Sequence, residues 1–579
     1  QLRAFKWSPS NVAFSFVLDD NVYYAASPEQ IPVKVTHNEK DGLLHGTFDW
    51  VYNEEIFGRG NIAQGAMWIS PSDKYLAYAS RRVNSSEKIL MTTYSREDRY
   101  DYNYEMEYPK TGEKRLAEMS VSIWSVEQNK SITIDVQLRD RESFHYLFGV
   151  SWVTLYGKEL LLTTWANRWQ NETSVTLCDY ETGACSLIYE HKYEHAQWAS
   201  PDDYANIVHS NSSFFILLPR PLEDNAWQHI AKLSITPDFR LDSIEFVPSG
   251  AYDIVTILAY RPAEDLIFYT AQAPHPWNLL VYASPAGERS ILKSDQCVTC
   301  GYSSCTFQER VDVSQGEDLK IELWCNGPGR GGRLRFSPIL STQPDGTVHY
   351  QLANLPKDDD FRPDFKIETF VLPSGYEALV QIFEGDLNLT SIPVTLFVYG
   401  APGFNQVADK PTRFPHSTGY KHALVHIDVR GSSGRGWNYR SQIYGRLITV
   451  EVQDTYEAMR MVLEKYPRLD KNRVGVHGWS HGGTITTGLV EVAPNGFFKC
   501  ACVGAPVTNF ALYDATYSER FMADTPLASY TDLTLDVSKF AHTKLLLVHG
   551  LRDDNVHFQH SALLIEALQQ ADIPFELMV

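Results

Sequence analysis

The pattern of apolar residues changes once along this chain of 579 residues, close to Leu355, and that change limits the folds open to it. Single domains usually contain roughly 100–200 residues, so at least two domains are expected. Before the change, apolar and polar residues alternate in short runs between turns, as at Val12–Phe16, Val22–Ala25, Tyr75–Ala79 and Leu266–Thr270. Alternation with a period of two predicts half-buried strands of antiparallel sheets. We therefore predict an all-β domain over residues 1–354.

A weak internal repeat runs through this first part. Trp7-Ser8-Pro9 returns as Trp68-Ile69-Ser70-Pro71 and as Trp198-Ala199-Ser200-Pro201. Repeats that each form one small antiparallel sheet are typical of a β-propeller, and we favour that fold. A set of β-sandwiches that share one turn sequence is the alternative.

After Leu355 the pattern predicts strands that alternate with helices. The apolar runs are Val394–Tyr399, Ala423–Ile427, Val474–His477 and Leu545–His549, and the helical spacings cover Val452–Lys465 and Ser561–Gln570. This alternation predicts a doubly wound α/β domain with a mostly parallel sheet over residues 355–579. The polar stretch Leu355–Arg362 is the predicted boundary.

The charge balance excludes some partners. With 51 Lys and Arg against 71 Asp and Glu, the formal net charge is −20. Such a surface repels phosphate backbones, so we expect no nucleic-acid partner. The sequence has no run close to 18 consecutive apolar residues, so it predicts no membrane-spanning helix within these residues. Because the first residues resemble neither a signal peptide nor a natural start, we expect further residues on both sides.

Cysteines and glycosylation sequons together indicate an oxidising, extracellular-facing environment. The sequons lie in polar stretches where a glycan would be exposed, at Asn84, Asn129, Asn171, Asn211 and Asn388. The spacing Cys297-x2-Cys300-x4-Cys305-x19-Cys325 leaves zinc open, but neither a histidine nor a second C-x-x-C pair completes a usual finger. We favour disulfides over zinc and over free thiols, and expect no metal and no cofactor.

The sharpest motif is the glycine-rich turn Gly478-Trp479-Ser480-His481-Gly482-Gly483. It follows the predicted strand Arg473–His477 and precedes the predicted helix Thr484–Val492, the context of a nucleophilic serine. In so tight a turn, side chains two residues before and after the serine would collide, while the helix start favours a developing anion. We predict Ser480 as the nucleophile; a turn with an inert serine is the alternative.

A nucleophilic serine needs a base, and the base needs a carboxylate that orients it. In this kind of domain the chain order is Ser, Asp, His, and Asp553 and Asp554 follow the run Leu545–His549. Asp553 is the first choice for the acid; a solvated acidic turn is the alternative. The base should follow the strand Phe575–Val579, so we assign it to none of the 18 histidines and expect it beyond this strand.

At these residues the chain resembles the dipeptidyl peptidase IV branch of the prolyl oligopeptidase family, serine peptidases that combine a β-propeller with an α/β-hydrolase. The resemblance covers essentially the whole chain. Besides the serine turn, it rests on Asp49–Phe57 (DWVYNEEIF), Val398-Tyr399, Asp428–Ser432 (DVRGS), Tyr513–Arg520 and His549–Gln559. It implies an N-terminal β-propeller and a C-terminal α/β-hydrolase with a mostly parallel sheet.

The resemblance implies roles in binding the substrate amine and the oxyanion. Glu54 and Glu55 match the family's double glutamate, which holds the free N-terminal ammonium of the substrate. Without the family they would pass as a solvated surface pair. Tyr399 matches the tyrosine that donates to the oxyanion beside the backbone N–H of His481.

The same resemblance implies a pocket for a proline ring. Flat aromatic and branched aliphatic walls suit such a ring, although these residues would otherwise pass as core. The implied substrate-binding residues are Val507, Phe510, Tyr513, Tyr517 and Val556, with Asn555 contacting the substrate backbone.

The resemblance also implies a disulfide pattern. The pairs are Cys178–Cys185, Cys297–Cys300 and Cys305–Cys325, and the partner of Cys500 would lie beyond Val579.

The chain departs from the family pattern at several positions. His481 stands where this branch usually has tyrosine, Phe510 replaces a tryptophan, and Ile448 interrupts a G-T-F-E-like stretch. The family arginine that binds the substrate carbonyl would precede Gln1.

These roles predict a serine exopeptidase that releases N-terminal dipeptides whose second residue is proline or alanine, through an acyl-enzyme. The alternatives are a homologue without activity that serves as a binding or auxiliary protein, and an endopeptidase that cleaves after proline. The family also implies a homodimer, and either secretion or a type II membrane anchor. Without the expected histidine, residues 1–579 alone should be inactive.

Overall fold

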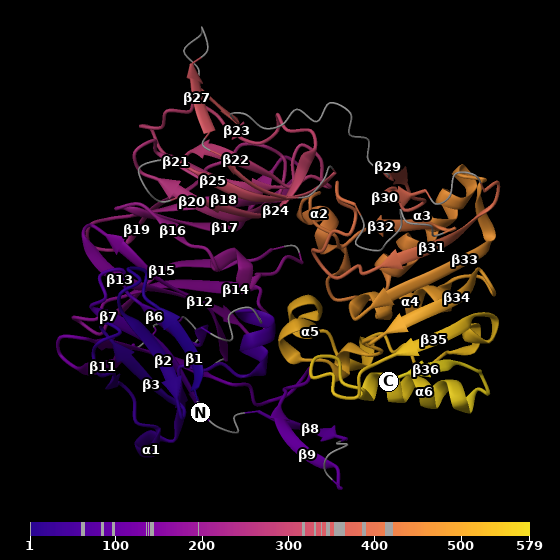
Figure 1. Ribbon diagram of the computed structural model, residues 1–579, viewed down its shortest axis with the longest axis horizontal. Coiled ribbons are helices and arrows are strands. Elements are labelled where there is room, and N and C mark those ends of the chain that lie inside the picture. The colour runs from indigo at the N-terminus through magenta and orange to yellow at the C-terminus, as the bar shows by residue number, and fades with distance from the viewer. Residues whose placement is uncertain are drawn as a thin grey trace.

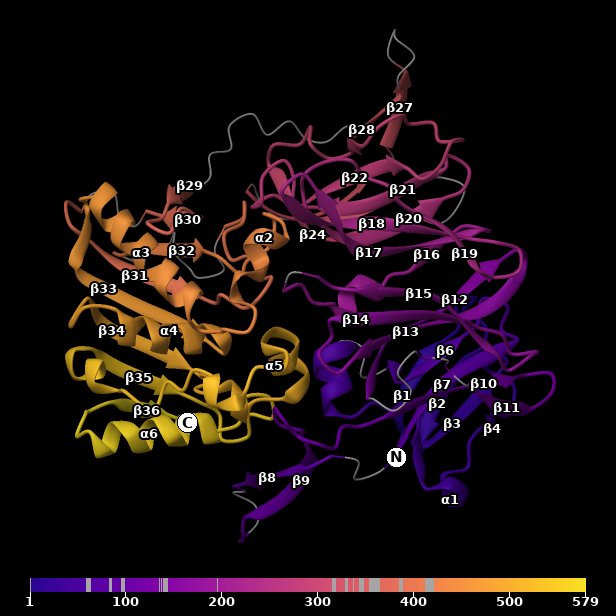
Figure 2. The ribbon, with the colours of Figure 1, turned by 180° about the vertical axis from the view of Figure 1, so that it is seen from behind.

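The computed structural model describes residues 2–58, 64–82, 86–94, 99–134, 136, 138, 144–194, 196–314, 319–328, 332–336, 338–342, 348–352, 365–384, 389–411 and 421–579. Two parts lie side by side, a series of antiparallel sheets and one large α/β sheet (Figure 1). Seen from behind, the same two parts again lie side by side (Figure 2). The predicted fold class, a β-propeller followed by an α/β-hydrolase, is confirmed.

The first part consists of antiparallel sheets whose strands succeed one another along the chain, as radial repetition requires. The first sheet contains β1 (Leu2–Trp7), β2 (Phe14–Leu18), β3 (Asn21–Ala25) and β4 (Val33–Lys34). The second contains β5 (Leu43–His45), β6 (Met67–Ile69), β7 (Tyr75–Arg82), β10 (Met119–Ser125) and β11 (Lys130–Thr133). The third contains β12 (His145–Leu155), β13 (Lys158–Asn167), β14 (Glu172–Cys178) and β15 (Cys185–Lys192).

The later sheets continue the series. The fourth contains β16 (Val208–His209), β17 (Ser213–Leu222), β18 (Asn225–Ile235) and β19 (Leu241–Phe246). The fifth contains β20 (Ile254–Arg261), β21 (Leu266–Ala271), β22 (Leu280–Pro285) and β23 (Gln296–Cys297). The next contain β24 (Cys305–Val313), β25 (Ile321–Pro328) and β26 (Gly332–Phe336), then β27 (Pro338–Thr342) and β28 (Val348–Leu352). A separate hairpin, β8 (Lys88–Thr93) with β9 (Tyr102–Glu107), projects from the second sheet region (Figure 1).

Burial along these strands differs from the sequence-based prediction in one respect. In β2 buried and half-buried residues alternate, as predicted. Strand β21, also predicted to be half-buried, is buried at every position. A sheet in the middle of a propeller packs between two neighbouring sheets, so both of its faces are covered.

Two of the three Trp-Ser-Pro repeats occupy the same structural position. Trp7 ends β1 and Trp68 lies in β6, and after each the serine N–H bonds to a carbonyl five residues on, at 2.9 Å from Ser8 and 2.8 Å from Ser70. The third repeat differs, because Ser200 caps the short 3-10 turn Pro201–Tyr204. The first two repeats therefore share one turn geometry, and the third has another.

The second part is one eight-stranded sheet in the order β29-β30-β32-β31-β33-β34-β35-β36. It is parallel from β32 onwards, and β29 and β30 join antiparallel at one edge. The strands are β29 (Phe365–Val371), β30 (Glu377–Phe383), β31 (Ile392–Val398), β32 (Ala423–Asp428), β33 (Leu469–Trp479), β34 (Phe498–Gly504), β35 (Lys544–Val548) and β36 (Glu576–Met578).

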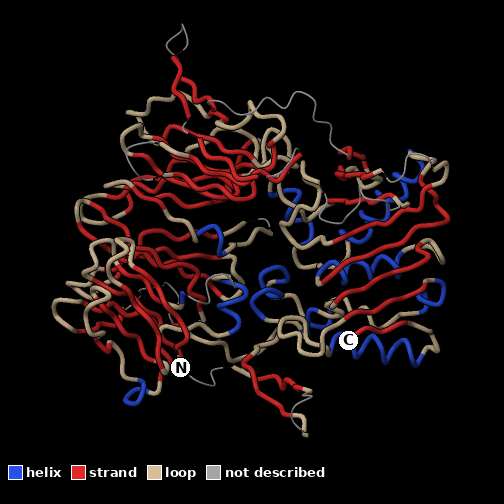
Figure 3. Tube along the Cα trace, viewed as in Figure 1, coloured by secondary structure: helices blue, strands red, loops and turns tan. Residues whose placement is uncertain are grey.

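Helices gather in the α/β part and along the line where the two parts meet (Figure 3). The helices predicted in the α/β part are confirmed within a few residues. They are α3 (Val450–Lys465), α4 (His481–Val492) and α6 (Gln559–Gln570). Further helices are α1 (Asn38–Asp41), α2 (Trp437–Arg440) and α5 (Ala515–Met522), with 3-10 turns at Ser441–Ile443, Phe510–Leu512, Leu527–Ser529 and Ser538–His542.

The predicted boundary Leu355–Arg362 lies outside the described residues. Strand β28 ends at Leu352 and the α/β sheet begins at Phe365, on either side of that stretch. The domain ranges 1–354 and 355–579 therefore stay predictions.

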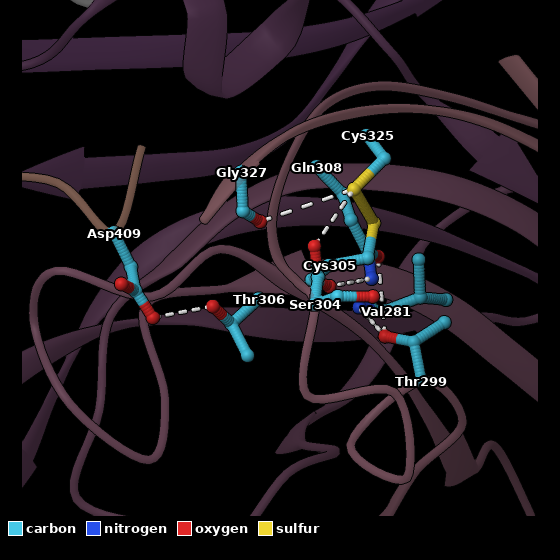
Figure 4. The surroundings of a disulfide bond; sticks show 9 residues. All are labelled: Val281, Thr299, Ser304, Cys305, Thr306, Gln308, Cys325, Gly327 and Asp409. Atoms are coloured by element: carbon cyan, nitrogen blue, oxygen red, sulfur yellow. Dashed lines mark hydrogen bonds between the residues drawn. A yellow bond between two sulfur atoms is a disulfide. The ribbon is translucent and has the colours of Figure 1, made fainter. Parts of the chain in front are cut away.

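The disulfides implied by the resemblance are present: Cys178–Cys185, Cys297–Cys300 and Cys305–Cys325. The zinc alternative is wrong, because its four cysteines pair with each other. Near Cys305–Cys325, Thr306 bonds to Asp409 of the α/β part, so this bridge lies beside a contact between the two parts (Figure 4). Cys500 and Cys502 are free thiols in the structure.

The predicted glycosylation sites differ in exposure. Asn129 and Asn211 are exposed, whereas Asn171 is half-buried and its side-chain oxygen Oδ1 accepts a hydrogen bond of 2.8 Å from the side-chain amide of Asn167. Asn84 and Asn388 lie outside the described residues. Within the part of the chain described, no helix is both long and apolar enough to cross a membrane.

Candidate active site

Ser480 lies in a strained turn between β33 and α4. Its φ of 56° is in the left-handed region, which a residue with a side chain rarely adopts. A Cβ on Gly478 would lie 2.1 Å from the carbonyl oxygen of Gly482, and one on Gly482 would lie 2.2 Å from that of Val398. Both positions therefore require glycine, for the steric reason that the motif predicts.

The sheet register brings Tyr399 close to this serine. In the parallel pair β31–β33, Val398 lies opposite Gly478, so Tyr399 and Ser480 leave the sheet at the same carboxyl edge. Burial raises the pKa of Tyr399, as do the charges of the nearby glutamates, while a hydrogen bond with Ser480 lowers it. The tyrosine hydroxyl thus stays protonated at neutral pH and can donate.

A cavity of about 400 Å³ opens above Ser480 between the two parts of the molecule. It gathers most of the predicted site residues, namely Glu54, Glu55, Tyr399, Ser480, His481, Val507, Phe510, Tyr513, Tyr517 and Asn555. Two predicted residues, Asp553 and Val556, do not line it.

The two glutamates reach the cavity from the propeller. They lie on a single π-helical turn, Tyr52–Ile56, which begins where the Tyr52 N–H donates to Asp49 at 2.9 Å. Single π-turns are frequent at functional sites. Both glutamates are half-buried rather than solvated as an isolated surface pair would be.

Contacts from the α/β part hold this acidic pair in place. The Asn555 amide donates to Glu54 at 2.9 Å. The Arg520 guanidinium lies 4.0 Å from the Glu55 carboxylate and donates to its backbone carbonyl at 3.1 Å. Both glutamates are therefore held at the cavity by residues of the α/β part.

Aromatic rings form an apolar wall beside the serine. Phe510 and Tyr517 stack with ring centroids 6.0 Å apart, and Tyr513 meets Tyr517 edge to face at 5.5 Å. Burial raises the pKa of both tyrosines well above its usual value, and the negative charge of Glu55 raises it further. Both hydroxyls therefore stay protonated at neutral pH.

His481 completes this wall with its ring. Nδ1 lies 3.3 Å from the Tyr517 hydroxyl, and burial lowers the histidine pKa to about 3. The imidazole is thus neutral at physiological pH. Its side chain forms part of the cavity surface, at the position where this branch usually has tyrosine.

Asp553 lies in the loop after β35, at the same edge of the sheet as Ser480. Its Oδ1 accepts the backbone N–H groups of Asn555 and Val556, both at 3.0 Å, and its other oxygen lies 3.7 Å from His549 Nε2. The carboxylate lines a second hollow, next to hairpin β8–β9, instead of the Ser480 cavity. Its role as the triad acid stays a prediction.

The sequence reasoning missed another part of the cavity wall. These lining residues are Trp198, Ser200, Asp202, Ala401, Pro402, Gly403, Phe404, Arg440, Arg520 and Phe521. Two of these residues, Trp198 and Ser200, belong to a Trp-Ser-Pro repeat found in the sequence, but the repeat indicated a turn and not a binding site. Among the described residues, no group of three His, Cys, Asp or Glu side chains is placed to hold a metal ion.

Family models match both parts of the chain. Residues 1–318 match the dipeptidyl peptidase IV (DPP IV) N-terminal region, and residues 414–579 match the prolyl oligopeptidase family. The chain belongs to the dipeptidyl peptidase IV branch of the prolyl oligopeptidase family. Both the propeller and the α/β-hydrolase part therefore match models of this family.

Individual relatives agree with this assignment. Dipeptidyl peptidase family member 1 of Caenorhabditis elegans is 38% identical over 601 residues, which cover 100% of this chain and 73% of that protein. Venom dipeptidyl peptidase 4 of Vespula vulgaris is 28% identical, with 99% and 75% covered. The crystal structure of Porphyromonas gingivalis dipeptidyl peptidase 4 has the same fold, with a TM-score of 0.80 at 22% identity, covering 100% of this chain and 78% of that one.

Proposed function

We propose that the protein is a serine exopeptidase that removes N-terminal X-Pro or X-Ala dipeptides from peptides. One observation carries the proposal: a single cavity contains Ser480, the acidic pair Glu54 and Glu55, and an aromatic wall. The carboxylates hold the substrate ammonium, and the apolar wall takes the ring of the second residue. The distance between ammonium and serine then admits two residues before the scissile bond.

The chemistry follows from this arrangement. A general base takes the Ser480 hydroxyl proton while the oxygen attacks the carbonyl carbon, and the proton then passes to the leaving amine. Tyr399 and the His481 backbone N–H donate to the tetrahedral oxyanion, an interaction worth about 2.7–4 kcal/mol per donor in related chemistry. Water then hydrolyses the acyl-enzyme. Asp553 orients the base in this proposal.

The test uses the natural polypeptide that includes residues 1–579. We expect it to hydrolyse Gly-Pro-p-nitroanilide, and Ser480→Ala to reduce turnover to the background rate. Acetyl-Gly-Pro-p-nitroanilide should be a poor substrate, because it has no ammonium. Equal cleavage of both anilides would instead favour an endopeptidase, and no cleavage of either would favour a binding or auxiliary role.

The environment and partners follow from the same proposal. The three disulfides of the described residues support an oxidising, extracellular-facing location, with either secretion or a type II anchor. Peptides with a free N-terminus are the proposed partners, and the homodimer implied by the family stays a prediction.

A further inference from the structure

We propose that Arg440 is a carboxylate-binding residue of the Ser480 cavity, so that the enzyme prefers peptides that carry a carboxylate near the scissile bond. This inference rests on the proposed peptidase function and adds a second charged group to substrate recognition. Arg440 ends helix α2 and lines the same cavity as Ser480 and the acidic pair.

The surroundings of Arg440 fix the plane of its guanidinium. Its Cζ lies 4.7 Å from the ring centre of Trp437 and 5.3 Å from that of Trp198. The two indoles meet edge to face at 4.9 Å. A Cβ on Gly403 would lie 2.6 Å from Arg440 Nη2, so the side chain fits closely against a glycine backbone with a φ of 72°. Such a rigid setting orients a cation without neutralising it.

This guanidinium has no ion pair or hydrogen bond to any residue that the structure describes. Its Nε is buried without a partner. Arg520, the other arginine of this cavity, differs: it donates to Gln170 at 2.6 Å and to the Glu55 carbonyl at 3.1 Å. A partly buried arginine without a partner is costly, and a ligand carboxylate would remove that cost.

The two carboxylates whose charges act most strongly on Arg440, Asp203 and Asp253, have other donors. Asp203 accepts from the Ser200 N–H at 3.0 Å and from Gln228 at 2.8 Å. Asp253 accepts the backbone N–H groups of residues 228, 434 and 436. Burial lowers the pKa of Arg440, while these acids raise it from a distance, which keeps the guanidinium charged. The donors of Arg440 therefore stay available to a ligand.

The ligand chemistry is that of a carboxylate, because a planar guanidinium can donate two parallel hydrogen bonds to one. The cavity thus combines an anionic region for an ammonium with a cationic residue for a carboxylate. Two sources fit: the C-terminal carboxylate of a short peptide, or an acidic side chain. Asp202, exposed and lining the same cavity, would weaken the binding of either.

The experiment measures binding to the Ser480→Ala variant by calorimetry, so that no turnover is needed. Gly-Pro-Gly is compared with its C-terminal amide, and Glu-Pro-Gly-amide with Gln-Pro-Gly-amide. We expect at least one acid to bind about 10-fold more tightly than its neutral partner, as hydrogen bonds between charged groups allow. The first pair reports a terminal carboxylate and the second an acidic side chain.

Variants of the cavity wall then assign the preference. Arg440→Met should remove the preference for the acid over its neutral partner, and Arg440→Lys should retain part of it. Asp202→Asn, at an exposed position, should increase the preference, and provides a test if Arg440→Met fails to fold.

The outcomes separate this inference from the proposed function. If neither acid binds more tightly than its neutral partner, the inference is wrong, although the exopeptidase proposal stands. If acetylated and free-amine peptides bind equally, the exopeptidase proposal fails. A preference that survives Arg440→Met, or that Asp202→Asn leaves unchanged, overturns the assignment to Arg440.

Discussion

Asn555 and Glu54, 501 positions apart in the chain, are joined by a hydrogen bond of 2.9 Å from the side-chain amide to the carboxylate. The same asparagine accepts a hydrogen bond from the Tyr513 hydroxyl, and its backbone N–H donates to Asp553. One residue thus connects the acidic pair of the propeller, the aromatic wall and the predicted triad acid. The distance between these groups depends on how the two parts pack together.

Replacing Asn555 should therefore disturb substrate binding more than chemistry. In Asn555→Ala, Glu54 loses a donor worth about 1.5–3 kcal/mol, because one partner is charged. We expect the KM for Gly-Pro-p-nitroanilide to rise about 10-fold, with a smaller change in kcat. Steady-state kinetics measure both, and thermal unfolding verifies that the variant is folded. A fall in kcat at constant KM would contradict the positioning role.

The acidic pair should determine the requirement for a free amine. We expect Glu54→Gln and Glu55→Gln each to raise the KM for Gly-Pro-p-nitroanilide or abolish its cleavage, because the ammonium loses a counter-charge. Glu29→Gln, at an exposed position of the propeller, is the matched control. If the variants cleaved the free-amine substrate as well as the wild type does, the assignment of this pair would be wrong.

An ion pair between the two parts should contribute to stability. Glu519 on α5 accepts two hydrogen bonds from Arg168 of the propeller, at 2.6 and 2.7 Å, and the Glu519 side chain is only 2% exposed. Glu519→Gln leaves Arg168 without its counter-charge, and breaking such a buried pair costs about 3–5 kcal/mol. Urea unfolding at pH 7 measures the loss of free energy.

A double variant distinguishes the pair from the individual residues. Arg168→Met with Glu519→Leu removes both charges, so we expect it to be more stable than Glu519→Gln alone. If the loss of stability in the double variant equals the sum of the losses in Arg168→Met alone and Glu519→Leu alone, the residues do not act as a pair.

Local patterns in the sequence were enough to predict several strands, the helices α3, α4 and α6, and the serine turn. The glycines at 478 and 482 are required by contacts within the turn and the adjoining strand, so the motif itself carries the information. Arg440 was missed for the opposite reason. Its partners Trp198 and Trp437 lie in different parts of the chain and meet only through packing, which no local periodicity reports. The full burial of β21 was missed likewise, because neighbouring sheets cover it.

Glu491 on α4 should make stability depend on pH. Burial raises the pKa of this carboxyl to about 9, the charges of Asp536 and Asp532 raise it further, and its Oε1 has no partner among the described residues. Between pH 4.5, the ordinary value, and about 9, the folded state holds a proton that the unfolded state has released. The free energy of unfolding therefore falls as the pH rises through this range.

Glu491→Gln removes that titration, so we expect a gain in stability that is absent at pH 4 and reaches about 2 kcal/mol at pH 8, a value reduced to allow for partial exposure. Urea unfolding at pH 4, 6 and 8 measures it. Glu566→Gln, on the exposed face of α6, should produce no such trend. At pH 4 the amide and the protonated carboxyl differ little in shape, so the substitution itself should change stability little. A gain of equal size at every pH would mean that packing, and not the proton held by Glu491, explains the effect.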